Sequence, residues 1–111
     1  MTEPVTRETL LRQALPDITT AVVEVRRITL QPGVAGGAHW HNGPVFGSIE
    51  KGSATLQVDG GAETVLRAGD VFYEPAAPQV IDRFDATSEG VTFLGYFLNG
   101  PGEVPELTPV E

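Results

Sequence analysis

The sequence predicts an all-β fold, a small antiparallel barrel or jelly roll that forms a single domain. Thirteen glycines and nine prolines separate short runs rich in Val, Thr, Ile and Phe. Turn signals about every eight to twelve residues are typical of sandwiches and barrels. With 111 residues the chain can bury one core without covalent staples, and its lack of cysteine excludes disulfides, thiolate metal sites and a cysteine nucleophile.

The first twenty residues are expected to form an N-terminal extension of a domain whose core spans about residues 22–98. Within the extension, Leu10, Leu11, Ala14 and Leu15 fit one face of a helix, and a following proline would end it. The pattern therefore favours a helix over residues 6–15. A strand that crosses to a neighbouring subunit is the alternative.

The strand pattern is clearer after residue 20, and about eight strands are expected. Their ranges are 21–30, 38–41, 45–50, 53–59, 62–66, 69–74, 79–85 and 90–98. Alternation over 53–59 directs Ala54, Leu56 and Val58 inward. A tight turn is expected at Lys51-Gly52 and a two-residue hairpin turn at Gly60-Gly61. The proline-rich tail over 100–111 is expected to wrap the surface or fray.

The two histidines of the chain lie two residues apart, at His39 and His41, after a Pro-Gly turn. In an extended strand they point to the same face, about 7 Å apart, while Trp40 points to the other. Two imidazoles on one face can bind the same divalent cation. Trp40 is then expected to pack on an outer layer or against a partner.

The sequence resembles the cupin family, whose barrels carry two separated motifs. The first motif reads Gly, five residues, His, one residue, His, three or four residues, Glu, six residues, Gly. The glutamate position falls on Val45, or on Phe46 in the longer spacing, and neither can bind a metal. The positions that match are Gly33, His39, His41 and Gly52.

The second cupin motif reads Gly, five residues, Pro, one residue, Gly, two residues, His. Gly69 and Pro75 match it. Strict spacing places Val80 at the histidine position, whereas one deleted loop residue places Gln79 there. We prefer Gln79, because the sequence after it continues as a similar strand.

The resemblance implies a metal site formed by His39, His41 and Gln79, suited to Zn, Fe, Ni, Co or Cu. Such a site lacks a charged ligand, which would lower its affinity and leave the ion a stronger Lewis acid. Tyr73 and Glu74 are the candidate catalytic residues, for proton transfer. Glu74 is also considered as a ligand, although a place at the rim of the site is favoured for it.

The interpretation that follows is a small-molecule enzyme with its active site inside the barrel, of the dioxygenase, isomerase or polyketide-cyclase type that the family includes. Two alternatives remain open. A metal-free barrel could bind a small apolar ligand, because six aromatic residues from 72 to 97 are available and about half should turn inward. A metal-free isomerase or cyclase could instead use the histidines as acid and base.

The charge of the chain argues against anionic partners. Seven basic and fifteen acidic residues give a net charge of −8, which disfavours nucleic acid and anionic membranes. No signal-peptide pattern and no run of about 20 apolar residues is present. A cytoplasmic protein is therefore expected. The family resemblance further implies a homodimer, with residues 6–15 as the exchanged segment.

Overall fold

Seven antiparallel strands form the fold in the computed structural model, which describes residues 4–110. The described residues contain no helix, so none is long and apolar enough to cross a membrane. The predicted all-β class is confirmed. The strands are β1 (Val22–Leu30), β2 (His39–His41), β3 (Val45–Val58), β4 (Thr64–Arg67), β5 (Val71–Glu74), β6 (Ile81–Asn99) and β7 (Leu107–Pro109).

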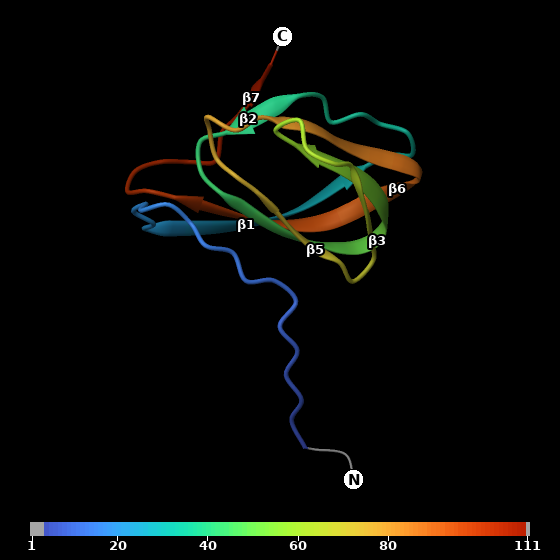
Figure 1. The fold of residues 1–111 in the computed structure, drawn as a ribbon, viewed down its shortest axis with the longest axis horizontal. Coiled ribbons are helices and arrows are strands. Elements are labelled where there is room, and N and C mark those ends of the chain that lie inside the picture. The colour runs from blue at the N-terminus through green and yellow to red at the C-terminus, as the bar shows by residue number, and fades with distance from the viewer. Residues whose placement is uncertain (1–3, 111) are drawn as a thin grey trace.

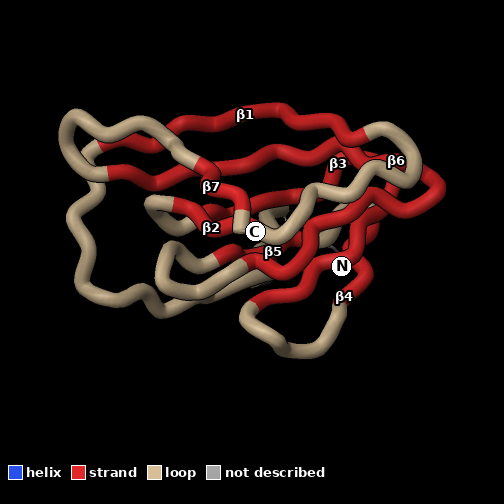
Figure 2. The backbone as a smooth tube through the Cα atoms, turned by 90° about the horizontal axis from the view of Figure 1, so that it is seen from above, coloured by secondary structure: helices blue, strands red, loops and turns tan. Residues whose placement is uncertain are grey.

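The two longest strands, β3 and β6, organise the barrel. They pair with each other, and the sheet runs in the order β4-β3-β6-β2-β7. β1 also pairs with β6, and β5 also pairs with β3. Each long strand thus curves from one side of the molecule to the other, which closes the sheet around an interior (Figures 1 and 2).

The length of β3 and β6 corrects the expected number of strands. The ranges 45–50 and 53–59 belong to one strand apart from residue 59, and the ranges 79–85 and 90–98 belong to another apart from residues 79 and 80. Lys51-Gly52 forms no hairpin turn, because the chain continues along β6 on both sides of it. Register shifts beside Lys51 and Gly52 bend the strand instead, as β-bulges do.

The hairpin between β3 and β4 lies one residue earlier than expected. Its residues of positive φ are Asp59 (50°) and Gly60 (72°), and the Gly61 N–H donates to the Val58 carbonyl at 2.9 Å. An Asp-Gly pair is a preferred sequence for a turn that requires two positive φ angles. The inward direction of Ala54 and Leu56 is confirmed, since both are buried.

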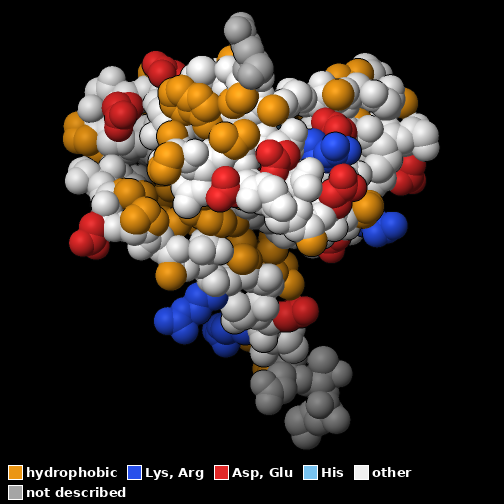
Figure 3. All heavy atoms as spheres, turned by 45° about the horizontal axis from the view of Figure 1, so that its top comes forward, with side chains coloured by type: hydrophobic (Ala, Val, Ile, Leu, Met, Phe, Trp, Pro, Cys, Tyr) orange, Lys and Arg blue, Asp and Glu red, His pale blue; other side chains and the backbone are white. Residues whose placement is uncertain are grey.

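The expected helix over residues 6–15 is wrong. The segment is extended, and its N-terminal end points away from the barrel (Figures 1 and 3). Residues 8–11 lie beside the outer face of β3, β5 and β6, with which they line a pocket. Leu10 is 60% exposed and Leu11 39%, so the barrel does not provide packing that buries the apolar face of a helix here. A helix this short is unstable in water without such packing. Exchange of the segment between two copies stays a prediction.

The C-terminal tail contributes a strand, which the sequence analysis missed. β7 pairs with β2 in the register His39↔Pro109 and His41↔Leu107. Asn42 fastens the approach to β7, because its side-chain NH₂ donates to the Val104 carbonyl at 2.9 Å. The tail therefore holds the outer edge of the strand that carries both histidines.

Aromatic side chains fill the interior between the strands. The Phe84 and Phe93 ring centroids lie 4.7 Å apart, and the Phe72 centroid lies 5.1 Å from that of Phe84. Of the six aromatic residues from 72 to 97, four turn inward, which is more than the expected half. Those that face the interior are Phe72, Phe84, Phe93 and Phe97.

Candidate metal centre and cavity

His39 and His41 lie side by side in the interior, as the strand alternation predicts. They are 4% and 5% exposed, and their ring centroids are 4.8 Å apart with the planes almost perpendicular. β2 is held on both sides, by β6 at Ile81 and by β7. Trp40 points to the opposite face and is half-buried. A three-residue strand is thereby fixed well enough to aim two rings at one point.

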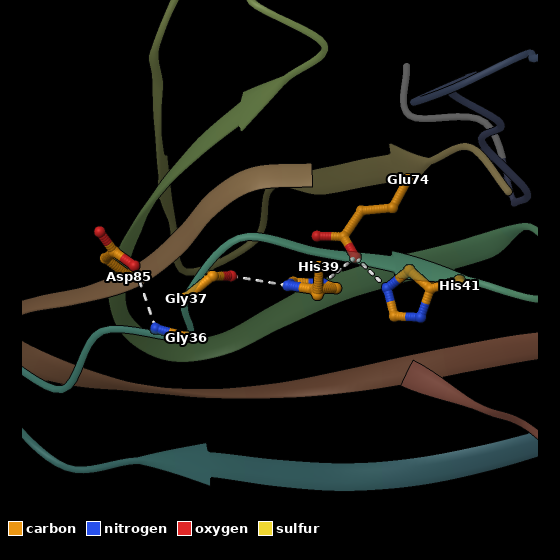
Figure 4. Close-up of polar contacts among 6 residues, drawn as sticks. All are labelled: Gly36, Gly37, His39, His41, Glu74 and Asp85. Carbon is orange, nitrogen blue, oxygen red and sulfur yellow. Dashed lines mark hydrogen bonds and ion pairs between the residues drawn. The ribbon is translucent and has the colours of Figure 1, made fainter. Parts of the chain in front are cut away.

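Glu74 supplies a carboxylate to the same point from β5. Its Oε1 lies 2.8 Å from His41 Nε2 and 3.8 Å from His39 Nε2, and the side chain is as buried as the histidines (Figure 4). The potential ligand atoms of the three residues all lie within 4.8 Å of one another. This His39–His41–Glu74 cluster could hold a metal ion.

The register of β3 and β5 explains how Glu74 reaches the cluster. Val45 pairs directly with Glu74, so the two side chains extend from neighbouring strands on the same face. Val45 occupies the position where the cupin motif has its glutamate. The carboxylate missing from β3 is thus present one strand away. The sequence held a signal for this, because strands over 45–50 and 69–74 were both expected, but their register was not known.

The loop before β2 sets the orientation of His39. Its Nδ1 lies 2.8 Å from the Gly37 carbonyl, which can only accept, so Nδ1 carries a proton and donates. In a neutral ring, Nε2 then presents its lone pair toward Glu74 (Figure 4). This is the usual arrangement of a metal-binding histidine. The donor set and its orientation therefore fit a divalent transition metal.

Two glycines permit this loop path. Gly37 has φ +77°, a conformation that other residues rarely adopt. A Cβ on Gly36 would lie 2.4 Å from the Phe84 carbonyl oxygen. The Gly36 N–H also donates to Asp85 Oδ1 at 3.0 Å. The loop is therefore packed against β6.

The charges in the cluster stabilise one another. Burial by itself raises the pKa of Glu74, but its contacts with His39 and His41 outweigh burial and hold that pKa below the ordinary value. Burial likewise lowers the pKa of His39, and its contacts with Glu74 and the Gly37 carbonyl raise it further than burial lowers it. The cluster thus favours an ionised carboxylate.

The cluster forms part of the wall of a cavity of about 300 Å³. This volume is at the lower end of the range for small-molecule sites. Most of the remaining wall is apolar, and the charged side chains besides Glu74 are Arg26 and Glu106. Among the described residues, the apolar side chains in the wall are Ile28, Leu30, Val45, Phe72, Phe84, Phe93, Phe97, Pro105 and Leu107.

Two of the expected site residues lie away from this cavity. Gln79 is exposed and does not line it. Tyr73 precedes Glu74 on β5 and so points to the outer face, where its ring packs on Phe46 with centroids 5.2 Å apart. Burial raises the pKa of Tyr73. The structure therefore brings together His39, His41 and Glu74 but places neither Gln79 nor Tyr73 beside them.

Comparison with known proteins identifies the class. The family model of the cupin domain matches residues 26–90, which is more than half of the chain. The chain therefore belongs to the cupin family. Comparison with curated protein sequences gives no significant match.

Solved cupin-like structures resemble this fold. A Klebsiella pneumoniae protein with a double-stranded β-helix domain has a TM-score of 0.63 and 21% identity, over 84% of this chain and 80% of its own. A DMSP lyase has a TM-score of 0.67 and 19% identity over 80% of this chain. Bacillus subtilis oxalate decarboxylase, which has Mn(II) centres, has a TM-score of 0.57 and 25% identity over 73% of this chain. This chain covers only 44% of the lyase chain and 22% of the decarboxylase chain.

Proposed function

We propose that this cupin is a divalent-metal-dependent enzyme that acts on a small molecule inside the barrel, with His39, His41 and Glu74 as the metal ligands. The observation that carries the proposal is the convergence of two imidazoles and one carboxylate on a mostly apolar cavity. Two histidines and one carboxylate form a known ligand set that leaves coordination positions open for substrate.

The charge of Glu74 removes the main objection that the sequence raised. A site of two histidines and an amide would carry no negative charge, whereas this cluster offsets one positive charge of a divalent ion. Zn, Fe, Ni, Co and Cu suit these ligands, and the Mn(II) centres of oxalate decarboxylase add manganese to the candidates. A bound ion would supply Lewis-acid polarisation of a substrate oxygen.

The residues of the chain then have distinct tasks. His39 and His41 present ring nitrogens from one short strand, and Glu74 presents an oxygen from β5. The aromatic wall excludes water and positions the apolar part of the substrate. Since Glu74 serves as a ligand in this proposal, it replaces Gln79 in that role and is not the proton carrier.

A second candidate is a metal-free acid–base enzyme, and the contact between His41 and Glu74 favours it. Their 2.8 Å separation is that of a hydrogen bond, and an imidazole held by a carboxylate is a common general base. The same residues thus serve either chemistry. Metal content separates the two candidates, and it also separates the first from a barrel that only binds an apolar ligand.

The test is metal analysis of protein purified without added metal, followed by titration of the apoprotein with Zn, Mn, Fe(II), Ni, Co and Cu. We expect one equivalent of metal per chain. His41→Ala should lower the affinity by more than about 100-fold, since even partners outside the ligand set typically contribute 10- to 100-fold.

Gln79→Ala is the matched control for this experiment, because it removes a polar side chain that the cupin motif places at the site but the structure places at the surface. It should leave the metal affinity unchanged. A wild-type protein that binds none of the six ions would overturn the proposal. Equal metal affinity in His41→Ala and the wild type would do so as well.

A further inference from the structure

Arg26 is a feature of the cavity that the metal proposal does not use. Among the described residues, no other Lys or Arg side chain lines the cavity. On β1 Arg26 shares a face with Ile28 and Leu30, which also line the cavity. Its side chain is 45% exposed, so it lies where the cavity meets solvent.

The surroundings of Arg26 leave its guanidinium available to a ligand. Gly95 is its partner on β6, so no side chain from that position competes for the space. The guanidinium carbon lies 5.2 Å from the centroid of the Phe97 ring, and Glu24 contacts Nε. Its two terminal nitrogens form no hydrogen bond with a described residue. These two terminal nitrogens can therefore donate hydrogen bonds to a planar anion.

Phe97 connects Arg26 with the metal cluster. Its ring centroid lies 6.2 Å from that of His41 and 5.2 Å from the Arg26 guanidinium carbon. A molecule that contacts both polar groups can therefore pack on the same aromatic ring. Phe84 and Phe93 supply further aromatic wall. The cavity thus contains two polar groups, the Arg26 guanidinium and the metal cluster, with an apolar surface beside them.

We propose that Arg26 binds the carboxylate of the substrate, and that the substrate is a small monocarboxylate with an apolar or aromatic body. The body would lie along Phe97, and the opposite end would reach the His39–His41–Glu74 cluster. The inference rests on the proposed function only in taking this cavity as the substrate site. Arg26 is then a specificity-determining residue.

The charges near the site favour a monoanion over a phosphate ester. Arg26 is one positive charge, whereas three carboxylates lie close to it or in the same cavity wall: Glu24, Glu74 and Glu106. The chain as a whole carries −8. A phosphate dianion would meet more repulsion than one guanidinium offsets, whereas a carboxylate matches the guanidinium in charge and in its planar, two-oxygen geometry.

The test compares acids with their uncharged amides on protein freed of metal, so that a carboxylate cannot bind to the metal instead. Fluorine NMR would measure the affinity of 4-fluorobenzoate and 4-fluorobenzamide, and calorimetry that of hexanoate and hexanamide. We expect the wild type to bind at least one acid about 5- to 10-fold more tightly than its amide, the size expected for a partly exposed charge-assisted contact.

Arg26→Gln should abolish this preference. Arg27→Gln is the matched control, because it removes the same charge one residue along β1, where the side chain pairs with Glu50. It should keep the preference. Glu24→Gln should strengthen acid binding, since it frees Nε of Arg26.

Three outcomes would overturn the inference: no acid preference in the wild type, including no binding of any probe; a preference that survives Arg26→Gln; or tighter binding of phenyl phosphate than of 4-fluorobenzoate.

Metal titration of Arg26→Gln distinguishes this inference from the proposed metal site. A normal metal affinity without acid preference in the wild type would refute the role of Arg26 alone. A lack of metal binding with an intact acid preference would refute the metal site alone.

Discussion

Two kinds of carboxylate contact in this molecule have similar distances and opposite environments. Glu74 lies 2.8 Å from His41 in the interior, where both side chains are 6% exposed. Glu50 lies 2.7 Å from Arg27 on the surface, where the side chains are 35% and 65% exposed. Water screens the surface pair, but it cannot replace a lost partner in the buried cluster. Distance alone therefore does not show which contact contributes more to stability.

The difference also lies in what each pair is connected to. Arg27 and Glu50 contact each other across the surface of the barrel. Glu74 meets two histidines, and His39 is fixed in turn by the Gly37 carbonyl. Changes to any member of this cluster should therefore affect the others, whereas the surface pair should act alone.

The largest effect on metal affinity is expected when the carboxylate is removed from position 74 on β5 and then placed at position 45 on β3. Glu74→Val should lower metal affinity by more than about 100-fold, the upper figure typical for a partner outside the ligand set. Adding Val45→Glu should restore much of it, because positions 45 and 74 are directly paired. Calorimetric metal titration of the wild type and both variants would measure this. Failure of the second substitution to recover affinity would show that β3 cannot deliver a carboxylate to the cluster.

Gly36→Ala should disturb the cluster from outside it. The new Cβ would collide with the Phe84 carbonyl, so the loop must move and His39 must move with it. We expect a loss of about 1–3 kcal/mol in the free energy of unfolding, typical of overpacking, and about a 10-fold loss of metal affinity. Urea unfolding and metal titration would test both. An unchanged metal affinity would mean that the loop does not orient His39.

The pH dependence of the metal-free protein should report the same coupling. The pKa of Glu74 is lowered, so its stabilisation is complete above pH 4.5 and is lost as the pH falls through its pKa in the folded state. The pKa of His39 is raised, so its contribution is complete below pH 6.5 and is lost as the pH rises through its folded pKa.

These two groups therefore contribute most to stability between about pH 4.5 and 6.5. Urea unfolding across pH 3–9 in the presence of a chelator would measure the profile. Glu74→Gln should flatten it, because both contributions depend on the ionised carboxylate. If the variant and the wild type gave parallel profiles, the coupling would be absent.

The smallest effect is expected at the surface pair. Arg27→Gln should leave both the unfolding midpoint and metal affinity within experimental error of the wild type, since an exposed ion pair contributes little. Thermal unfolding at low and high salt would check this. A loss comparable to that of Gly36→Ala would contradict the contrast between the two environments.

The sequence was most informative where the chemistry is local. The spacing of His39 and His41 placed both rings on one face, because strand alternation depends only on neighbouring residues. It was least informative for β7 and residues 6–15. A proline-rich tail gave no sign that it would pair with β2, and the apolar residues in the helical pattern of residues 6–15 are not buried by the barrel.

Sequence by itself determined the all-β class, the cupin resemblance and the two histidines. Tertiary structure decided the third member of the cluster and the role open to Arg26. Glu74 lies 33 residues from His41, and its position depends on the register between β3 and β5. Register is a long-range property, and a shift of one residue would turn Glu74 to the outer face. For that reason the carboxylate could be named from the sequence but could not be placed.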